Sequence, residues 1–312
     1  MPCADQPSNW CGNAGWFPLY PWTLGLLHRL GVPLGFSAAA VSWLFAGATL
    51  LLLWRTFLQR GRSAAAIGAL LYAAFAPGQV YGYASFPLSM LAFFTVLHLW
   101  ALWRERFVVA GLAGAAAALS YPIGVLLVAI SALWLLSDRE VAWRVRLLRV
   151  ATASGLTLAG CLLLLVVQRS ETGHWDAYLL VHEKYDHGFR NPLSAFWRLI
   201  HPLVNGSVWW IENAPAAQTF LVALVLLAVV VTVATRRAAR TRLHLLLVVW
   251  AVITWAFPLT QGNLSPARAH AALLPLALLV RELPPPLLYA IVVVATALSL
   301  PMTALYLQGK LP

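Results

Sequence analysis

Long apolar runs, separated by short polar or basic loops, fill most of the chain. Of the 312 residues, 61% are hydrophobic and only 10% are charged, whereas soluble domains are about 45–50% apolar and about 25% charged. A helix needs about 20 apolar residues to cross a bilayer, so runs of this kind are typical of an integral membrane protein. The composition therefore excludes an ordinary soluble domain.

The apolar runs predict an all-α, polytopic protein with about ten hydrophobic segments, which form one membrane domain over residues 1–312. We expect these segments at residues 36–57, 64–83, 86–103, 107–119, 122–136, 149–167, 216–235, 243–258, 269–281 and 285–307. Two of them should be short helices that meet at Ser120-Tyr121-Pro122, because proline lacks an N–H and restricts the residue before it. Helices too short to cross a bilayer are tolerated where they are buried in protein or line a cavity.

The basic residues gather in the short loops between apolar runs, and this placement predicts an orientation. If the N-terminus is outside, the inner loops hold 14 of the 21 basic residues, as the positive-inside rule requires. These are Arg55, Arg60, Arg62, Arg104, Arg106, Arg139, Arg144, Arg146, Arg149, Arg236, Arg237, Arg240, Arg242 and Arg281. We therefore expect a multi-pass cell-membrane protein with extracytoplasmic segments at 1–35 and 168–215. The same placement argues against nucleic acid as a partner, despite a net charge of +11.

Two of the three cysteines, Cys3 and Cys11, share the polar N-terminal segment. A disulfide between them and two free thiols both fit an outer segment, and the sequence leaves both open. Cys161 lies in an apolar run and is interpreted as a small core residue.

A compact motif precedes the first apolar run. In Gly15-Trp16-Phe17-Pro18-Leu19-Tyr20-Pro21-Trp22, two prolines flank a tyrosine and indicate a rigid turn that leads into a helix. An ordinary interfacial turn would fit the same residues. The string from Trp16 to Pro21 resembles the Phe-Phe-Pro-Leu-Tyr-Pro signature of the GPI mannosyltransferase II (PIG-V type) family and its bacterial relatives.

Three weaker matches follow in the same order along the chain. Ala118-Leu119-Ser120-Tyr121-Pro122-Ile123-Gly124 is similar to an Ala-Leu-Ser-Arg-Pro-Thr-Gly stretch of that family. Tyr83-Ala84-Ser85-Phe86-Pro87-Leu88-Ser89 stands where the family has a Tyr-Ser-Glu-Ser-like helix start. Ser265-Pro266-Ala267-Arg268-Ala269-His270 resembles a late Ser-x-x-Arg-Tyr motif. Together the matches cover most of the chain.

The resemblance implies a GT-C-type membrane glycosyltransferase. Such an enzyme moves a sugar, usually mannose, from a polyprenyl-phosphate donor in the membrane lipid to a glycan, lipid or protein acceptor outside the cytoplasm. A carboxylate acts as general base on the acceptor hydroxyl, and the lipid phosphate leaves. No metal and no cofactor besides the donor is expected. The substrate-binding residues it implies are Phe17, Pro18, Tyr20, Pro21, Tyr121, Arg268 and His270. Arg268 could equally be an arginine that snorkels to the membrane interface.

The chain departs from the family pattern at the expected catalytic acid. The family's Trp-Asp follows a first transmembrane helix, whereas here only 16 residues precede Phe17 and contain no apolar run. We expect either that the start at Met1 lies too late, so that the helix and its Trp-Asp are missing, or that the chain is a degenerate relative of the family. Tyr121 replaces the family's arginine and Pro87 its glutamate. The remaining candidates for the general base are Asp5, Asp176 and Glu183.

The second polar segment is rich in histidine, with His174, His182 and His187 beside several carboxylates. It lacks the His-Glu-x-x-His spacing of zinc proteases, so a solvated or acceptor-facing segment is favoured over a metal site. Lys184, Arg190 and Arg198 could contact a phosphate or a lipid headgroup.

Three classes of function are compatible with the sequence. The first is the glycosyltransferase, and the second is a non-catalytic membrane partner or pseudoenzyme of the same fold. A transporter comes third, because the internal repeat and intramembrane charges typical of transporters are not evident.

Overall fold

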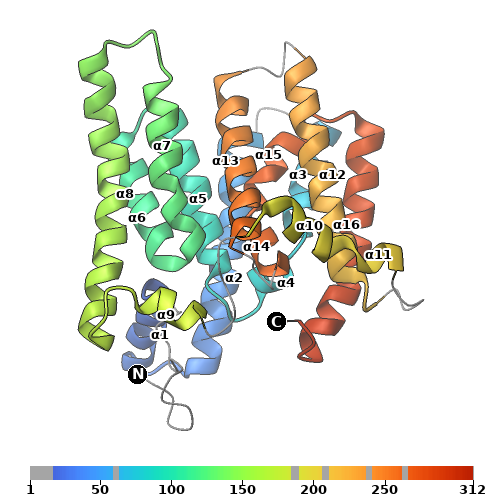
Figure 1. Ribbon diagram of the computed structural model, residues 1–312, viewed down its shortest axis with the longest axis horizontal. Helices are drawn as coiled ribbons and strands as arrows, with labels where there is room; N and C mark the ends of the chain where they lie inside the picture. Colours follow the sequence, from blue (N-terminus) through green and yellow to red (C-terminus); the bar gives the residue numbers. More distant parts are fainter. Residues whose placement is uncertain are drawn as a thin grey trace.

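The computed structural model describes residues 17–58, 63–183, 190–205, 211–236, 241–261 and 266–311. Within these ranges every regular element is helical, which confirms the all-α fold class (Figure 1). The elements are α1 (Leu19–Arg29), α2 (Leu34–Leu53), the π-helix η2 (Trp54–Leu58), α3 (Ala64–Ala74), α4 (Val80–Tyr83), α5 (Leu88–Trp103), α6 (Phe107–Ser120), η3 (Pro122–Leu126), α7 (Leu127–Leu136), α8 (Trp143–Thr172), α9 (Ala177–Glu183), α10 (Pro192–Ile200), α11 (Pro202–Asn205), α12 (Ala214–Thr235), α13 (Arg242–Thr260), α14 (Pro266–Ala271), η5 (Leu274–Leu276), α15 (Ala277–Val280) and α16 (Pro285–Leu307).

Five helices among the described residues are long and apolar enough to cross a membrane. They are Leu34–Leu58, Trp143–Thr172, Ala214–Thr235, Arg242–Thr260 and Pro285–Leu307. Shorter apolar helices occupy Ala64–Ala74, Leu88–Trp103, Phe107–Ser120 and Pro122–Leu136. The chain is a membrane protein, but the predicted count of about ten segments is not confirmed, because several predicted segments are shorter or broken.

The predicted segment 269–281 is the clearest correction. It is divided among α14, η5 and α15, because Pro275 has no N–H for a continuous helix. Its side chains from Leu274 to Val280 are buried within the protein, which is where irregular backbone at membrane depth is tolerated. The predicted segment 64–83 is likewise interrupted, between α3 and α4. By contrast, α6 ends at Ser120 and η3 begins at Pro122, as predicted.

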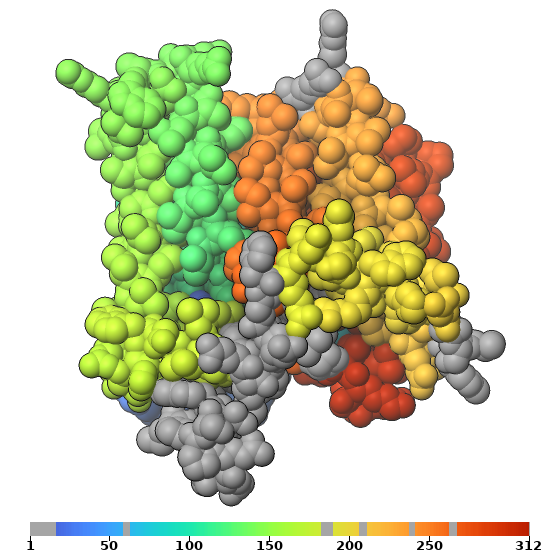
Figure 2. Space-filling view, viewed as in Figure 1, coloured from blue at the N-terminus to red at the C-terminus, as the bar shows by residue number. Residues whose placement is uncertain are grey.

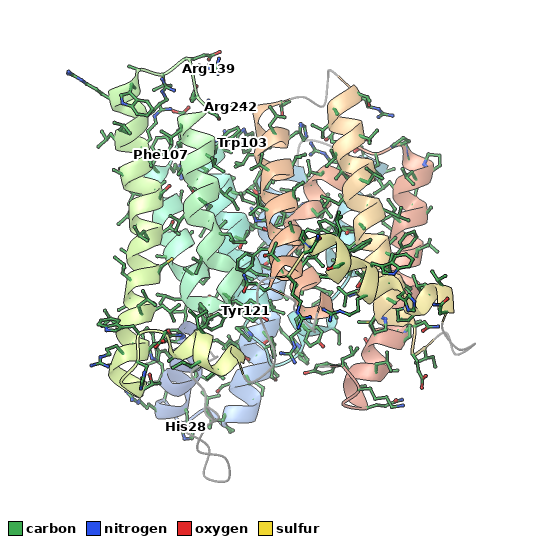
Figure 3. All side chains as sticks on the ribbon, viewed as in Figure 1. His28, Trp103, Phe107, Tyr121, Arg139 and Arg242 are labelled. Carbon is green, nitrogen blue, oxygen red and sulfur yellow. The ribbon has the colours of Figure 1, made fainter. Side chains whose placement is uncertain are left out.

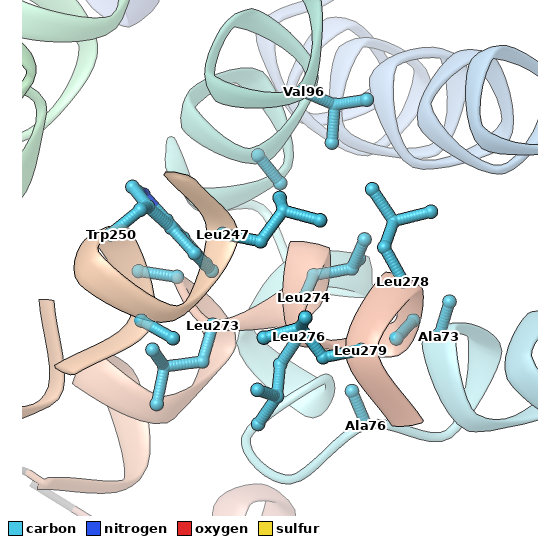
Figure 4. Close-up of a cluster of buried hydrophobic side chains, with 14 of the residues drawn as sticks. Ala73, Ala76, Val96, Leu247, Trp250, Leu273, Leu274, Leu276, Leu278 and Leu279 are labelled. Carbon is cyan, nitrogen blue, oxygen red and sulfur yellow. The ribbon is translucent and has the colours of Figure 1, made fainter. Parts of the chain in front are cut away.

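The core lies where α3, α5, α13 and the η5–α15 segment meet (Figure 4). Trp250 and Leu247 of α13 pack there with Leu274 and Leu278, and all four side chains are almost fully buried. Elsewhere α6 and α8 approach closely, because Gly160 leaves a Cβ position only 2.6 Å from the Cα of Ala115. Small residues of this kind allow membrane helices to pack backbone against backbone.

The bundle has two contrasting ends. The α7–α8 loop, the end of α12 and the start of α13 lie at the upper edge of Figure 1, whereas α1, α9 and the C-terminus lie at the lower edge. Arg139 and Arg242 mark the upper end, and Tyr121 lies in the lower part (Figure 3). We call the upper edge the arginine end; its described members are Arg55, Arg104, Arg106, Arg139, Arg144, Arg146, Arg149, Arg236, Arg242 and Arg281. The described arginines of these clusters thus gather opposite α1 and α9.

The predicted segment 168–215 contains helices. It carries the end of α8, then α9, α10 and α11. Helices α10 and α11 lie across the outer face of α12 and α13 (Figure 2), and the backbone N–H of Arg190 donates to the carbonyl of Thr260.

Candidate functional site

Arg268 lies on the short helix α14 and is surrounded by aromatic rings. Its guanidinium carbon is 5.3 Å from the ring centroid of Phe86 and 5.7 Å from that of Tyr81. Both distances are within the range of cation–π attraction. Among the described residues, Arg268 has no carboxylate partner, and its buried Nε has no hydrogen-bond acceptor. Since buried polar groups are normally paired, this orphaned donor suits an anionic ligand.

The aromatic rings around Arg268 belong to helices distant in sequence. Tyr81 of α4 contacts Tyr306 of α16 edge-on, with ring centroids 5.4 Å apart, and Phe86 at 5.8 Å. Phe86 in turn lies 6.4 Å from Tyr121, at the junction of α6 and η3. Because these rings are held from several elements, the cradle fixes the position of the guanidinium. We call Tyr81, Phe86, Tyr121, Tyr306 and Arg268 the aromatic cradle.

The motif tyrosine Tyr20 supports this cradle from α1. Its buried hydroxyl donates to the carbonyl of Ala38 at 3.0 Å and lies 3.2 Å from the hydroxyl of Ser42. Ser42 also accepts from the backbone N–H of Phe86, over 3.3 Å. Burial raises the pKa of Tyr20, the bond to Ser42 opposes the rise, and nearby Tyr306 adds to it. Tyr20 is therefore a positioning residue for the Phe86 segment.

Phe17 joins the same region from the other side. It is buried against Leu119 and Leu164, and its ring meets Tyr178 of α9 edge-on at 5.5 Å. Burial raises the pKa of the Tyr178 phenol, and the neighbouring Tyr121 adds to the rise. Phe17 and Tyr121, two predicted residues, are thus linked through a tyrosine that the sequence did not single out.

The two motif prolines differ in exposure. Pro18 is buried at the start of α1, whereas Pro21 is exposed in its first turn. Proline is favoured at a helix start because its missing N–H would have no partner there. The turn at Pro18 leads into α1, as predicted.

His270 fixes α14 rather than facing an opening. Its side chain is buried, and its Nδ1 lies 3.2 Å from Nε2 of Gln218. The Gln218 Oε1 accepts from the backbone N–H of Gly78 at 2.9 Å. Since an N–H can only donate, the Gln218 amide must donate to His270, whose Nδ1 is then unprotonated.

Gly78 is required where the α3–α4 turn meets α14. Its φ is +80°, and a Cβ there would lie 2.2 Å from the carbonyl oxygen of Ala267. Any side chain would push α14 away and move Arg268 with it. His270, Gln218 and Gly78 together set the position of the guanidinium.

Of the three predicted base candidates, Asp176 is the one whose side chain the structure describes. Asp176 is exposed just before α9 and pairs with His174 at 3.8 Å, and among the described residues no hydrogen bond or ion pair joins it to Arg268. Glu183 is the last residue of α9. Asp5 lies outside the described residues, as do Cys3, Cys11 and Lys184. Arg198 is exposed on α10, and no group of three or more metal-binding side chains occurs in the described ranges.

Sequence reasoning missed most of the supporting residues: Ser42, Gly78, Tyr81, Tyr178, Gln218 and Tyr306. The Pro77-Gly78 pair is a turn signal within a predicted helix and could have indicated the break. The others are polar or aromatic residues in apolar runs, and only the folded chain shows what they contact.

The comparisons with known proteins now bear on this geometry. No family model matches the sequence, and no curated protein matches it. Among solved structures, the fold is similar to that of ArnT from Cupriavidus metallidurans, crystallised bound to undecaprenyl phosphate. The TM-score is 0.56 at 18% sequence identity, over 85% of this chain and 49% of ArnT. The chain thus spans about half the length of that protein. In fold, the chain is thus an all-helical membrane protein similar to part of ArnT.

Proposed function

We propose that the chain is an integral-membrane glycosyltransferase that uses a polyprenyl-phosphate sugar, with mannose as the first candidate. The observation that carries the proposal is the guanidinium of Arg268, which lies over two aromatic rings with an unpartnered Nε. A phosphate is the natural partner for such a group, because an arginine fork binds it through charge-assisted hydrogen bonds. The GT-C-type fold supports a lipid-linked donor.

In this proposal the reacting end is the aromatic cradle, on the extracytoplasmic side. The acceptor hydroxyl attacks the anomeric carbon of the donor in one inverting displacement. Its proton passes to a carboxylate, and the bond from sugar to lipid phosphate breaks with its electron pair on the phosphate. Arg268 stabilises the negative charge that the leaving phosphate acquires. The orientation follows from the arginine distribution, which favours a cytoplasmic arginine end.

The general base is proposed from the carboxylates Asp5, Asp176 and Glu183. A positioned base contributes about 10²–10⁴-fold to the rate. Asparagine or glutamine replacement of each should identify it, since the true base loses turnover while donor affinity stays. Equal turnover in all three variants would remove them from the mechanism.

The alternative, a non-catalytic membrane partner of the same fold, uses the same phosphate site and differs in turnover. The deciding experiment incubates the chain, in lipid nanodiscs, with radiolabelled polyprenyl-phosphate mannose and follows label on acceptor lipids, glycans and peptides. Label transfer that is lost in Arg268→Ala supports the enzyme. Donor binding without transfer to any acceptor supports the non-catalytic partner.

Arg236 supplies the matched control for that experiment. It lies at the opposite end, where it donates to the carbonyl of Glu282 over 3.3 Å. We expect Arg236→Ala to keep donor use within about twofold, whereas Arg268→Ala should reduce it at least about tenfold, as for a charged hydrogen bond. Equal effects of the two substitutions would exclude Arg268 from the site.

A further inference from the structure

A groove at the arginine end, far from the aromatic cradle, has the form of a lipid site. It opens between the start of α6 and the start of α8, with a volume of about 550 Å³. Its walls are mainly apolar and exposed, and include Val108, Val109, Val145 and Leu148. We propose that this groove binds an anionic phospholipid from the leaflet that faces the arginine end.

The groove owes its shape to a change in packing along α6 and α8. At Gly111 the two helices touch, since a Cβ there would lie 2.9 Å from the carbonyl oxygen of Thr152 and 2.6 Å from Leu156. Toward the arginine end, larger side chains such as Phe107 and Leu148 replace the glycines and the groove opens. Thr152 therefore closes one end of the groove, and the charged residues lie at the other.

The charged end is built around a strained residue, Glu105. It adopts φ +56° at the C-terminus of α5, a position that glycine normally occupies. The backbone N–H of Arg106 donates to Ala101 at 2.8 Å, and that of Glu105 donates to Leu102 at 3.1 Å, which together close the turn. Strain of this kind is found where side-chain placement serves a function.

The strained turn places two arginines at the mouth of the groove. Arg149 donates to the Glu105 carboxylate at 3.1 Å and lies 5.0 Å from the ring centroid of Phe107, so it forms part of the wall. Arg106 is exposed and lies 5.2 Å from the ring centroid of Trp100. Within the described part of the chain, Arg106 has no carboxylate partner.

The apolar walls and the arginine at the mouth match the two ends of a phospholipid. The apolar walls suit an acyl chain, and the unpaired cation at the mouth suits a headgroup phosphate at the membrane surface. Trp100 holds the guanidinium near that surface, as aromatic residues do at membrane interfaces. A free phosphate would leave the apolar walls uncovered, so the occupant is the lipid itself.

Native mass spectrometry of the detergent-purified full chain tests the proposal. Phosphatidylglycerol and phosphatidylcholine with identical acyl chains are titrated in parallel, so that the headgroup charge alone differs. We expect the anionic lipid to bind about fivefold more tightly, the effect of one arginine near a membrane surface. Arg106→Gln should remove this preference, whereas Arg139→Gln, an exposed arginine of the same end, should keep it.

Substitutions in the walls of the groove provide an independent test. Val108→Trp and Leu148→Gln change side chains that are 56% and 68% exposed, so the variants should fold. Each substitution should weaken the binding of both lipids. Glycerol phosphate, which lacks acyl chains, should not displace the bound lipid. The proposal is overturned if Arg139→Gln acts like Arg106→Gln, if neither groove variant weakens binding, or if undecaprenyl phosphate displaces phosphatidylglycerol from the wild type.

Discussion

The Asp138 site at the arginine end and the aromatic cradle at the other end hold their arginines in opposite ways. At the arginine end, the buried carboxylate of Asp138 is shared by Arg242 of α13 and Arg149 of α8, and so joins distant helices. At the other end, Arg268 meets aromatic rings and, among the described residues, no carboxylate. An arginine that is already neutralised stabilises a fold, whereas one held by neutral rings keeps its charge for a ligand.

The difference extends to the backbone around each arginine. Asp138 lies in the loop between α7 and α8, whereas α14 is wedged against the α3–α4 turn at Gly78. The stability of the Asp138 site should therefore depend on its charges, and that of the α14 region on the close packing at Gly78.

Gly78→Ala should be the most damaging small substitution. A left-handed φ costs a non-glycine residue about 1–2 kcal/mol, and the clash with Ala267 adds about 1–3 kcal/mol. Gly31 has a similar φ of +89° with no atom within 4 Å, so Gly31→Ala should show the backbone effect alone. Thermal unfolding in nanodiscs measures both variants, and equal losses would contradict the wedge at α14.

Asp138→Ala should destabilise the protein by about 2–3 kcal/mol. Removing one partner of a buried pair leaves uncompensated charge, but Arg242 is 44% exposed, so water replaces part of the interaction. Donor binding at the cradle should stay unchanged in the folded fraction. Glu140→Ala, an exposed carboxylate two residues on, is the control, and a similar loss there would mean that Asp138 is not the cross-link.

Glu282 should make the arginine end acid-sensitive. The hydrogen bond from His244, then burial in the opposite direction, then Arg281 leave the pKa of Glu282 at about 2, below its ordinary 4.5. A lowered pKa contributes stability that is present above pH 4.5 and is lost as the pH falls toward 2. Glu282→Gln should remove the fall in the free energy of unfolding between pH 4.5 and pH 2 and leave it unchanged at higher pH. An unchanged pH dependence would show that Glu282 does not pair with His244 and Arg281.

Tyr20→Phe should have the smallest effect on stability, about 1 kcal/mol for its hydrogen bonds. Its effect on the cradle should be larger than that number suggests, because Ser42 also holds the Phe86 backbone. We expect weaker donor binding with little change in melting temperature. Thr23→Val is a control on the same helix, since the Thr23 hydroxyl donates within α1, to the carbonyl of Leu19.

The sequence predicted the class of fold because apolar runs and arginine clusters are local patterns. The junction at Tyr121-Pro122 and the turn before α1 were also predictable, since proline acts on its immediate neighbours. The break of segment 269–281 has the same local cause, Pro275, but it was not predicted because the run was read as one apolar segment. The cradle could not be derived either, as Tyr81, Phe86 and Arg268 meet only in the folded chain.

The central claim, that Arg268 binds the phosphate of a lipid-linked donor, is tested by the affinity of the nanodisc-embedded protein for undecaprenyl phosphate. We predict that Arg268→Ala lowers this affinity at least about tenfold, that Arg268→Lys recovers only part of it because the planar fork is lost, and that Arg236→Ala leaves it unchanged. Wild-type affinity in a folded Arg268→Ala variant would contradict the account.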